Sequence, residues 1–267
     1  MKNKRYACMT LDFELDYGGR VQACETLKEV HLHRDLRQRL DRLEVPLSAF
    51  VQTSLFEDYQ NASEVLKTLA VEYHSHSHSH DAEASPGLLG LERSRDLLHK
   101  HFPQKMCGYR APYGKLYSGD EDLIKKAGYQ FDASLFPSVR PGKFNHLTSP
   151  IHPHRLDNGL LEIPFGVLPY ARLILGVSYM KLFGRSFYRA LSAVTGLPRV
   201  LVFYAHLHDW FPTGATREFS PLLRMAFDRN GQKGISITEA WLQHLKAEGY
   251  TFVTMNQLAE ILEEEGV

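Results

Sequence analysis

The chain has 267 residues, of which 43% are apolar, so it is long enough to bury the core of one large domain. Its 31 Lys and Arg residues balance its 31 Asp and Glu residues, which argues against a general nucleic-acid binder, because such proteins use excess cations to displace phosphate counterions. No stretch approaches the roughly 20 uncharged apolar residues that a membrane-spanning helix needs.

Short apolar runs alternate with segments of helical period, a pattern typical of β-α units that surround parallel strands with helices. We expect strands at 6–13, 46–52, 69–74, 106–112, 129–133, 160–164, 199–206 and 250–255, and helices at 34–43, 59–68, 88–101, 119–127 and 236–247. Seven or eight such units predict a closed or nearly closed barrel, in which active groups lie where strands end and loops begin. We find neither a linker nor a repeat, and we expect a single domain over 1–267.

Three acidic residues lie where the first predicted strand ends, in TLDFELDYGG. Asp12, Glu14 and Asp16 recur with a period of two, so in an extended chain they share one face. Anions on one face repel each other unless a cation or a change in protonation relieves them. These residues therefore indicate a metal site or, alternatively, a strand end that emerges into water.

The run VEYHSHSHSHD at 71–81 carries four histidines at alternate positions. Residues four apart lie about 13 Å apart on a strand, so we expect a helical turn if two of them share a metal. The pairs His74/His78 and His76/His80 would then face opposite ways, and only one pair could point into a site. A solvated polar loop or a core histidine with satisfied hydrogen bonds is the alternative interpretation.

The segment 165–197 lies between two predicted strands and is rich in Leu, Ile, Phe and Tyr. Its only charged residues are the cations Arg172, Lys181, Arg185 and Arg189. One interpretation is a helical hairpin packed on the barrel. The other is a surface helix that contacts a membrane or a lipid-linked sugar, since an apolar face bordered by cations suits an anionic interface.

Six motifs occur in the order and approximate spacing of a known family: LDFELD, EYHSHSHSH, GYRAPYG, AGYQFDASLFPS, LLEIPFGVLP and VFYAHLHDW. Over roughly residues 5–262 the chain resembles the polysaccharide deacetylases with the NodB homology fold, carbohydrate esterase family 4, and above all the branch found in exopolysaccharide gene clusters. The resemblance implies an α/β fold, a distorted (β/α)7 barrel. It also implies one catalytic domain with an apolar insertion at about 165–197.

The resemblance implies that Asp12 is the general base and that Glu14 is a metal ligand. Glu14 stands where the family more often has aspartate, which lengthens the ligand arm by one methylene, and Asp16 remains an alternative ligand. The ion implied is one divalent metal, with zinc the first choice.

The family's second motif places a glutamate four residues before the first metal-binding histidine. Glu72 has this position relative to His76, so the resemblance implies His76 and His80 as metal ligands. A register two residues earlier, with His74 and His78, also fits the pattern.

Arg110 matches the arginine that keeps the base ionised, as a guanidinium beside a carboxylate does. On residue type alone, a surface ion pair would be the simpler interpretation of Arg110. Tyr113 matches the residue whose backbone N–H lies near the oxyanion.

Asp132 matches the aspartate that orients and tunes the catalytic histidine. The last motif aligns His206 with that histidine, the general acid, and Asp209 with the trailing acid. His208 would lie on the same strand face as His206, and Leu207 replaces the family's proline, so either histidine could be the acid. We expect His208 and Asp209 to lie beside the substrate.

The implied activity is metal-dependent removal of an N-linked acyl group, acetyl first of all, from an amino sugar of a polysaccharide, a glycan precursor or a lipid-linked sugar. A deformylase of a formamido sugar is one alternative, and a non-catalytic metal- or sugar-binding protein is another. The presence of Asp12, Arg110 and a histidine at 206 or 208 favours an enzyme.

Three cysteines without a CxxC pair, Cys8, Cys24 and Cys107, and an N-terminus that reaches acidic residues before a signal-peptide core predict a reduced, cytoplasmic protein. If 165–197 contacts lipid, we expect the protein at the inner face of the membrane, with peripheral contact through this segment. We expect no nucleic-acid partner.

Overall fold

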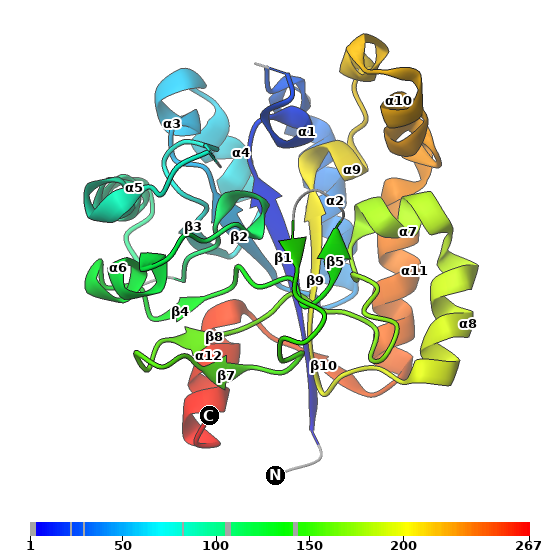
Figure 1. Ribbon diagram of the computed structural model, residues 1–267. Helices are drawn as coiled ribbons and strands as arrows, with labels where there is room; N and C mark the ends of the chain where they lie inside the picture. Colours follow the sequence, from blue (N-terminus) through cyan, green and yellow to red (C-terminus); the bar gives the residue numbers. More distant parts are fainter. Residues whose placement is uncertain (1–3, 22, 29, 82, 105–107, 141–143) are drawn as a thin grey trace.

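The computed structural model describes residues 4–21, 23–28, 30–81, 83–104, 108–140 and 144–267. A row of mostly parallel strands runs through the molecule, and helices pack around it, as Figure 1 shows. Cys107 and part of the predicted strand 106–112 lie outside the described residues. Cys8 and Cys24 are buried and free.

The first strand, β1 (Arg5–Phe13), lies at the centre of this row. It pairs in parallel with β2 (Leu47–Val51), β9 (Val200–His206) and β10 (Tyr250–Phe252). β2 pairs in parallel with β3 (Glu72–Ser75). The carboxyl ends of β1, β2, β3 and β9 therefore meet at one edge, where sites form in folds of this kind.

The row continues beyond β3 through short segments. Isolated parallel bridges at Tyr109 link β3 to β4 (Phe131–Asp132), which pairs in parallel with β8 (Leu161–Glu162). After β8, the N–H of Gly166 donates to the carbonyl of Val202 in β9, at 2.9 Å. The α/β class and the parallel row agree with the predicted barrel fold, although no continuous ladder closes the row among the described residues.

Three further two-residue strands were not predicted. They are β5 (Val139–Arg140) and β6 (Phe144–Asn145), which pair with each other, and β7 (His154–Arg155), which pairs with β8. A strand of two residues has no period that a sequence pattern could reveal.

The helices follow amphipathic segments. The α-helices are α1 (Asp16–Gly19), α2 (Val30–Arg42), α3 (Leu55–Asp58), α4 (Ala62–Leu69), α5 (Gly87–His101), α6 (Asp120–Lys126), α7 (Val177–Phe183), α8 (Arg185–Thr195), α9 (Leu207–Trp210), α10 (Pro221–Asp228), α11 (Gly234–Ala247) and α12 (Met255–Glu264). The 3-10 turns are η1 (Glu25–Leu27), η2 (Pro112–Gly114), η3 (Gly214–Glu218) and η4 (Gly231–Lys233). The predicted helices agree with α2, α4, α5, α6 and α11 within a few residues, whereas α10 and α12 were not predicted. None of the helices among the described residues is long and apolar enough to cross a membrane.

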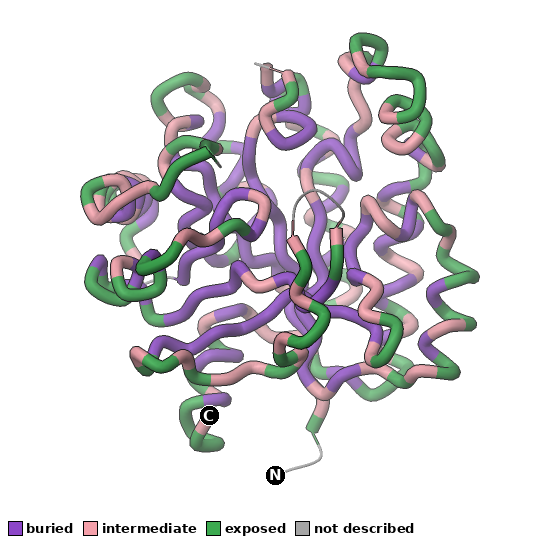
Figure 2. The backbone as a smooth tube through the Cα atoms, in the orientation of Figure 1, coloured by how far each residue is buried: buried purple, intermediate pink, exposed green. Residues whose placement is uncertain are grey.

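The two faces of β1 have different neighbours. Ala7, Met9 and Leu11 belong to the large core beneath the surrounding helices, whereas Cys8 belongs to a smaller core inside the row. Because successive side chains alternate, Asp12 lies on the same inner face as Cys8, at the carboxyl end of the strand. Figure 2 shows that the central strands are buried along most of their length.

The apolar insertion contains a helical hairpin, α7 followed by α8. α7 packs against β9 and α11, and the hydroxyl of buried Tyr188 in α8 donates to the carbonyl of Ile174. The interpretation as a hairpin packed on the barrel is therefore confirmed. Two of its cations have internal contacts: Arg172 donates to the carbonyl of Ser149, and Lys181 is buried.

Candidate active site

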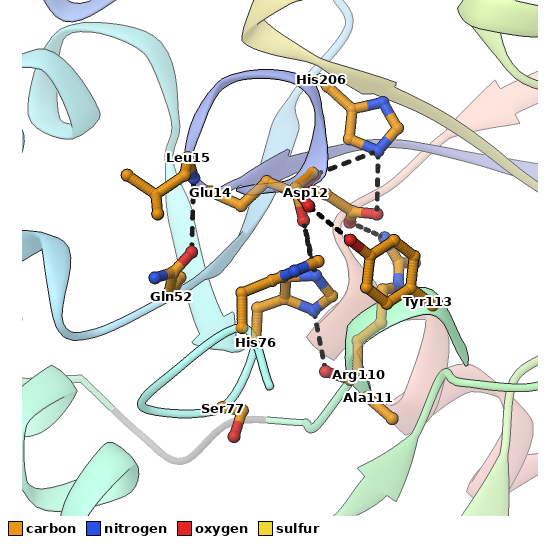
Figure 3. Close-up of polar contacts among 12 residues, drawn as sticks. Asp12, Glu14, Leu15, Gln52, His76, Ser77, Arg110, Ala111, Tyr113 and His206 are labelled. Carbon is orange, nitrogen blue, oxygen red and sulfur yellow. Dashed lines mark hydrogen bonds and ion pairs between the residues drawn. The ribbon is translucent and has the colours of Figure 1, made fainter. Parts of the chain in front are cut away.

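A cavity of about 370 Å³ opens at the edge where the strands end. Asp12 and Glu14 project into it from the end of β1, and His206 does so from the end of β9. The loop after β3 contributes His76 and His80. The structure thus brings together side chains that lie up to 194 residues apart in the sequence. Figure 3 shows Asp12 and Glu14 between His206 on one side and His76 on the other.

The three acidic residues of the first motif separate. Asp12 and Glu14 line the cavity, but Asp16 turns into the loop that follows. Asp16 accepts hydrogen bonds from the backbone of Glu25 at 2.8 Å and from the hydroxyl of Thr26 at 2.6 Å. Asp16 therefore anchors a loop, and the alternative that it replaces Glu14 as a ligand is wrong.

The paired histidines do not lie on a helix, contrary to our expectation. β3 ends at Ser75, and Ser77 has a φ of 66°, which turns the chain back sharply. This turn brings the ring of His80 to within 5.3 Å of the ring of His76, measured between centroids. The left-handed backbone conformation of Ser77 thus brings the two histidines together, which we had expected a helical turn to do.

The nitrogens of these histidines converge on Glu14. Its Oε2 atom lies 3.1 Å from Nε2 of His76 and 2.5 Å from Nε2 of His80. The Nδ1–H of His76 donates to the carbonyl of Arg110 at 2.8 Å, which leaves its Nε2 lone pair directed at the carboxylate. Burial opposes the charge of Glu14, but His80 and His76 hold its pKa well below the usual value.

This group fits a divalent metal. One ligand atom from each of Glu14, His76 and His80 lies within 4.8 Å of the others, and Nδ1 of His80 is buried without a hydrogen-bond partner among the described residues. Two imidazoles and one carboxylate around open positions are typical of catalytic zinc sites. The side chains are therefore of the type and arrangement that the predicted metal requires.

The other two histidines of the run are bound elsewhere. Nε2 of His74 lies 2.5 Å from Oε1 of Glu72, and its Nδ1 accepts from the N–H of Gly108 at 3.0 Å. Nδ1 of His78 contacts the hydroxyl of Thr53 at 3.2 Å. The alternative register with His74 and His78 as ligands is therefore wrong.

Arg110 is fully buried and holds Asp12, so the interpretation as a surface ion pair is wrong. Its Nη1 atom donates to Oδ1 of Asp12 at 2.5 Å and to the hydroxyl of Thr10 at 3.1 Å. The ring centroids of Phe50 and Phe165 lie 3.7 and 4.2 Å from the guanidinium carbon, so both rings pack against it. Packing and charge together fix the orientation of the Asp12 carboxylate.

Tyr113 lines the cavity from the short turn η2, with a φ of 55°. Its hydroxyl donates to the carbonyl of Gly18, and its ring lies 4.6 Å from the ring of His80, measured between centroids. The predicted role of its backbone N–H stays a prediction.

His206 is the histidine that faces the carboxylates. Its Nε2 atom lies 3.6 Å from Oε1 of Glu14 and 4.0 Å from Oδ2 of Asp12, and its Nδ1 donates to Oδ2 of Asp209 at 3.2 Å. Burial alone would lower the pKa of His206. The hydrogen bond to Asp209 and the charges of Glu14 and Asp12 outweigh burial and raise it to about 9.

His208 does not share a strand face with His206, contrary to our expectation. The strand ends at His206, where the backbone N–H donates to Asp209, and α9 begins at once. Nδ1 of His208 accepts from the N–H of Tyr17 at 3.1 Å, and its ring stacks on that of His206 with centroids 4.8 Å apart. Burial and the charge of His206 lower its pKa to about 3, which suits a neutral acceptor.

Asp209 has the place that we expected of Asp132. It is fully buried and accepts from the hydroxyl of Ser178 at 2.7 Å and from the ammonium of Lys181 at 3.4 Å, in addition to His206. Although burial opposes its charge, Lys181 and His206 hold its pKa far below the usual value. We had predicted that Asp209 lies beside the substrate. Instead, these contacts hold it in place, and it orients His206.

Asp132 lies in register with Glu162 of the neighbouring strand, and the hydroxyl of Ser134 donates to it at 2.5 Å. Burial raises the pKa of Asp132 to about 6, and burial together with the charge of Asp132 raises the pKa of Glu162 well above its usual value. The contacts of Asp132 among the described residues do not include His206. The prediction that Asp132 orients the histidine is wrong, because β4 pairs with β8 and not with β9.

The sequence did not point to Ser178 and Lys181. Both lie in α7, within the insertion for which we considered a packed hairpin and a surface helix, and neither interpretation gave a role to these two residues. The only signal is the helical period, which places Lys181 beside the buried Val177 and Met180. A lysine on the apolar face of a helix indicates a buried partner, but not which one.

No family model matches the sequence, and no curated protein matches it closely. Among solved structures, a Mycobacterium smegmatis protein assigned as a polysaccharide deacetylase is 17% identical, with a TM-score of 0.64, over 100% of this chain and 93% of that one. A peptidoglycan N-acetylglucosamine deacetylase is 13% identical, with a TM-score of 0.53, over 96% and 88%. A Bacillus anthracis family 4 pseudoenzyme is 12% identical, with a TM-score of 0.53, over 97% and 66%. The chain therefore has the fold of the family 4 carbohydrate esterases.

Proposed function

We propose that this protein is a metal-dependent hydrolase that removes an N-linked acyl group, acetyl first of all, from an amino sugar. The observation that carries the proposal is the convergence of Glu14, His76 and His80 on a cavity that also contains Asp12 and His206. The fold shared with polysaccharide deacetylases supports the same reaction class.

Glu14, His76 and His80 would hold the metal. A divalent ion such as zinc polarises an amide carbonyl and lowers the pKa of water. Asp12 accepts the proton of the attacking water at its Oδ2 atom, because Oδ1 is engaged by Arg110. Arg110 holds this carboxylate in a fixed orientation, aimed at the cavity.

The leaving amine needs a proton, and His206 supplies it. Its Nε2 atom faces the cavity carboxylates, and its Nδ1–H is held by Asp209. Asp209 favours the protonated imidazole by Coulomb attraction and fixes the ring, while Lys181 and Ser178 fix Asp209. The products are a free amine on the sugar and a small carboxylic acid.

Two alternatives lead to different products. A deformylase would release formate, and the described residues that line the cavity do not distinguish the two acyl groups. A non-catalytic binding protein is disfavoured, because Arg110 still engages Asp12 and Asp209 still engages His206. The predicted cytoplasmic location stays a prediction.

The proposal is tested with purified protein, loaded with zinc or stripped by a chelator, on N-acetylated and N-formylated amino sugars. We expect metal-dependent release of free amine, measured together with acetate and formate. A protein that binds metal and these sugars but releases no acid from any of them would be a binding protein.

A further inference from the structure

The cavity has one wall with few polar groups. To this wall, α7 contributes Tyr179 and Leu182, and α10 contributes Leu223, Ala226 and Phe227. A sugar presents hydroxyls that need hydrogen-bond partners, and the α10 side chains offer none. This wall therefore suits a part of the substrate that is not sugar.

α10 is apolar toward solvent as well as toward the cavity. None of its residues is buried, and Leu222 and Met225 are 75% and 61% exposed. Its two charged residues, Arg224 and Asp228, pair with each other at 3.2 Å. In Figure 1 this helix lies above α7 at the rim of the molecule. An apolar surface thus continues from the cavity to the outside along α10, which we call the α10 wall (Leu222, Leu223, Met225, Ala226 and Phe227).

Two arginines line the same cavity. Arg20 donates to the carbonyl of Tyr17 at 3.0 Å, and Arg140 projects from β5. Burial and the charge of Glu14 raise the pKa of the Tyr113 hydroxyl, and the nearby charges of Arg20 and Arg140 partly oppose this shift. Neither has a carboxylate within ion-pair distance among the described residues. Two uncompensated guanidiniums beside an apolar wall favour an anion attached to a hydrocarbon.

We propose, on the basis of the proposed function, that the substrate is an N-acyl amino sugar joined through a phosphate to a long hydrocarbon chain. The sugar lies at Asp12, the phosphate at Arg20 and Arg140, and the chain along the α10 wall. This assigns the lipid-linked class among the sugars considered above. A polymer would extend further sugar units over a surface that offers them no hydrogen bonds.

The test compares three soluble substrates that share N-acetylglucosamine: the ethyl and the decyl esters of its 1-phosphate, and the neutral decyl glycoside. We expect kcat/KM for the decyl phosphate to exceed that for the ethyl phosphate by about tenfold or more, because burying only two methylenes is worth about that factor. Equal values, or a preference for N-acetylated oligosaccharides, would overturn the proposal.

Two variants, with one control, test which residues contact the hydrocarbon chain and the phosphate. Leu223→Gln should bring the decyl-to-ethyl ratio toward one, whereas Leu89→Gln, an equally polar change on the exposed face of α5, should leave it unchanged. Arg140→Gln should lower kcat/KM more for the decyl phosphate than for the decyl glycoside. A ratio that survives Leu223→Gln would place the chain elsewhere and overturn the assignment.

Equilibrium binding to the Asp12→Asn protein separates this proposal from the proposed function. We expect the decyl phosphate to bind at least about tenfold more tightly than the ethyl phosphate. If the decyl ester binds tightly but wild-type protein releases no acid from any substrate, the amphiphile site stands and the hydrolase function fails. If wild-type protein releases acid but the decyl and ethyl esters bind equally well, the hydrolase function stands and the amphiphile site fails.

Discussion

Histidines of β3 and of the loop that follows it contact glutamates in two places, Glu72 and Glu14. The two contacts differ in which other groups occupy the hydrogen-bonding atoms. In the first, Oε1 of Glu72 accepts from His74, from the hydroxyl of Ser48 at 3.1 Å and from the backbone N–H of Asn256 at 3.0 Å. The N–H of Gly108 occupies the other nitrogen of His74. Protein groups thus occupy Oε1 of Glu72 and both ring nitrogens of His74.

In the second contact, Glu14 lies against both His76 and His80 at the wall of the cavity. One carbonyl fixes the ring of His76, and the remaining nitrogens converge where a cation can enter. The same residue types therefore form a structural contact where backbone N–H groups occupy their acceptor atoms. They form a candidate metal site where their lone pairs face a cavity. The predictions below test this difference, from the largest expected effect to the smallest.

Replacing His76 by alanine should remove metal binding, because a direct ligand is lost. The expected loss in affinity exceeds the about 10–100-fold that loss of an outer hydrogen-bond partner costs. His74→Gln is the matched control, since its amide can still donate to Glu72, and it should retain the metal. Metal analysis of both purified proteins would contradict the assignment if only the His74 variant lost the ion.

Asp12→Asn keeps nearly the same shape but cannot take a proton from water. We expect this variant to fold and to retain most of its metal, while amide hydrolysis falls by about 10²-fold or more, the usual worth of a positioned base. Rates on an N-acetylated amino sugar at equal metal occupancy test this. Near-normal turnover would show that another group is the base.

Asp209→Asn should lower hydrolysis by about tenfold or more, because His206 loses the charge that favours its protonated form. Asp132→Asn, at the position we first expected to do this, should have little effect on the rate, since Asp132 contacts Glu162 instead. Measured rates that fall in the Asp132 variant but not in the Asp209 variant would restore the original assignment.

Asp209→Asn also leaves Lys181 buried without its partner, which destabilises the fold. The double variant Lys181→Met/Asp209→Asn removes both charges and should recover thermal stability but not activity. Recovery of both would mean that Asp209 acts only through stability.

Glu72→Gln should weaken the fold and spare the metal. Burial opposes the charge of Glu72, but His74 lowers its pKa to about 2, below the about 4.3 of an unfolded chain. The stabilisation is therefore present above about pH 4.3 and is lost as the pH falls toward 2. We expect the free energy of unfolding at pH 7 to drop by about 1–3 kcal/mol, with a shallower decline in acid.

Urea unfolding at pH 7 and pH 3, with metal analysis at pH 7, measures both effects. Unchanged stability at pH 7 would mean that the pair contributes nothing to the fold. Loss of the metal would mean that the two pairs are not independent.

The sequence by itself determined the features that depend on short spacing. The period of β1 places Asp12 on the inner face at the strand end. The spacing of the histidine run left two pairs open, and only the resemblance to the family's second motif, with Glu72 four residues before His76, favoured the pair that faces Glu14. The alternation of strand and helix patterns indicated the α/β class, and the resemblance of the ordered motifs implied the barrel. The predicted helices and the longer strands lie within a few residues of those observed, although α10 and α12 were not predicted. Local periods and spacings are sufficient for these features because they depend on residues close together in the chain.

Only the tertiary structure decided which distant groups meet. That Asp209 and not Asp132 holds His206 depends on β4 pairing with β8. Both strands were expected from the sequence, but their local pattern does not say which strands become neighbours. That Lys181 reaches Asp209 depends on how α7 packs against β9. Contacts between segments are set by sheet curvature and helix packing, which sum many weak interactions over the whole chain, so no local pattern encodes them.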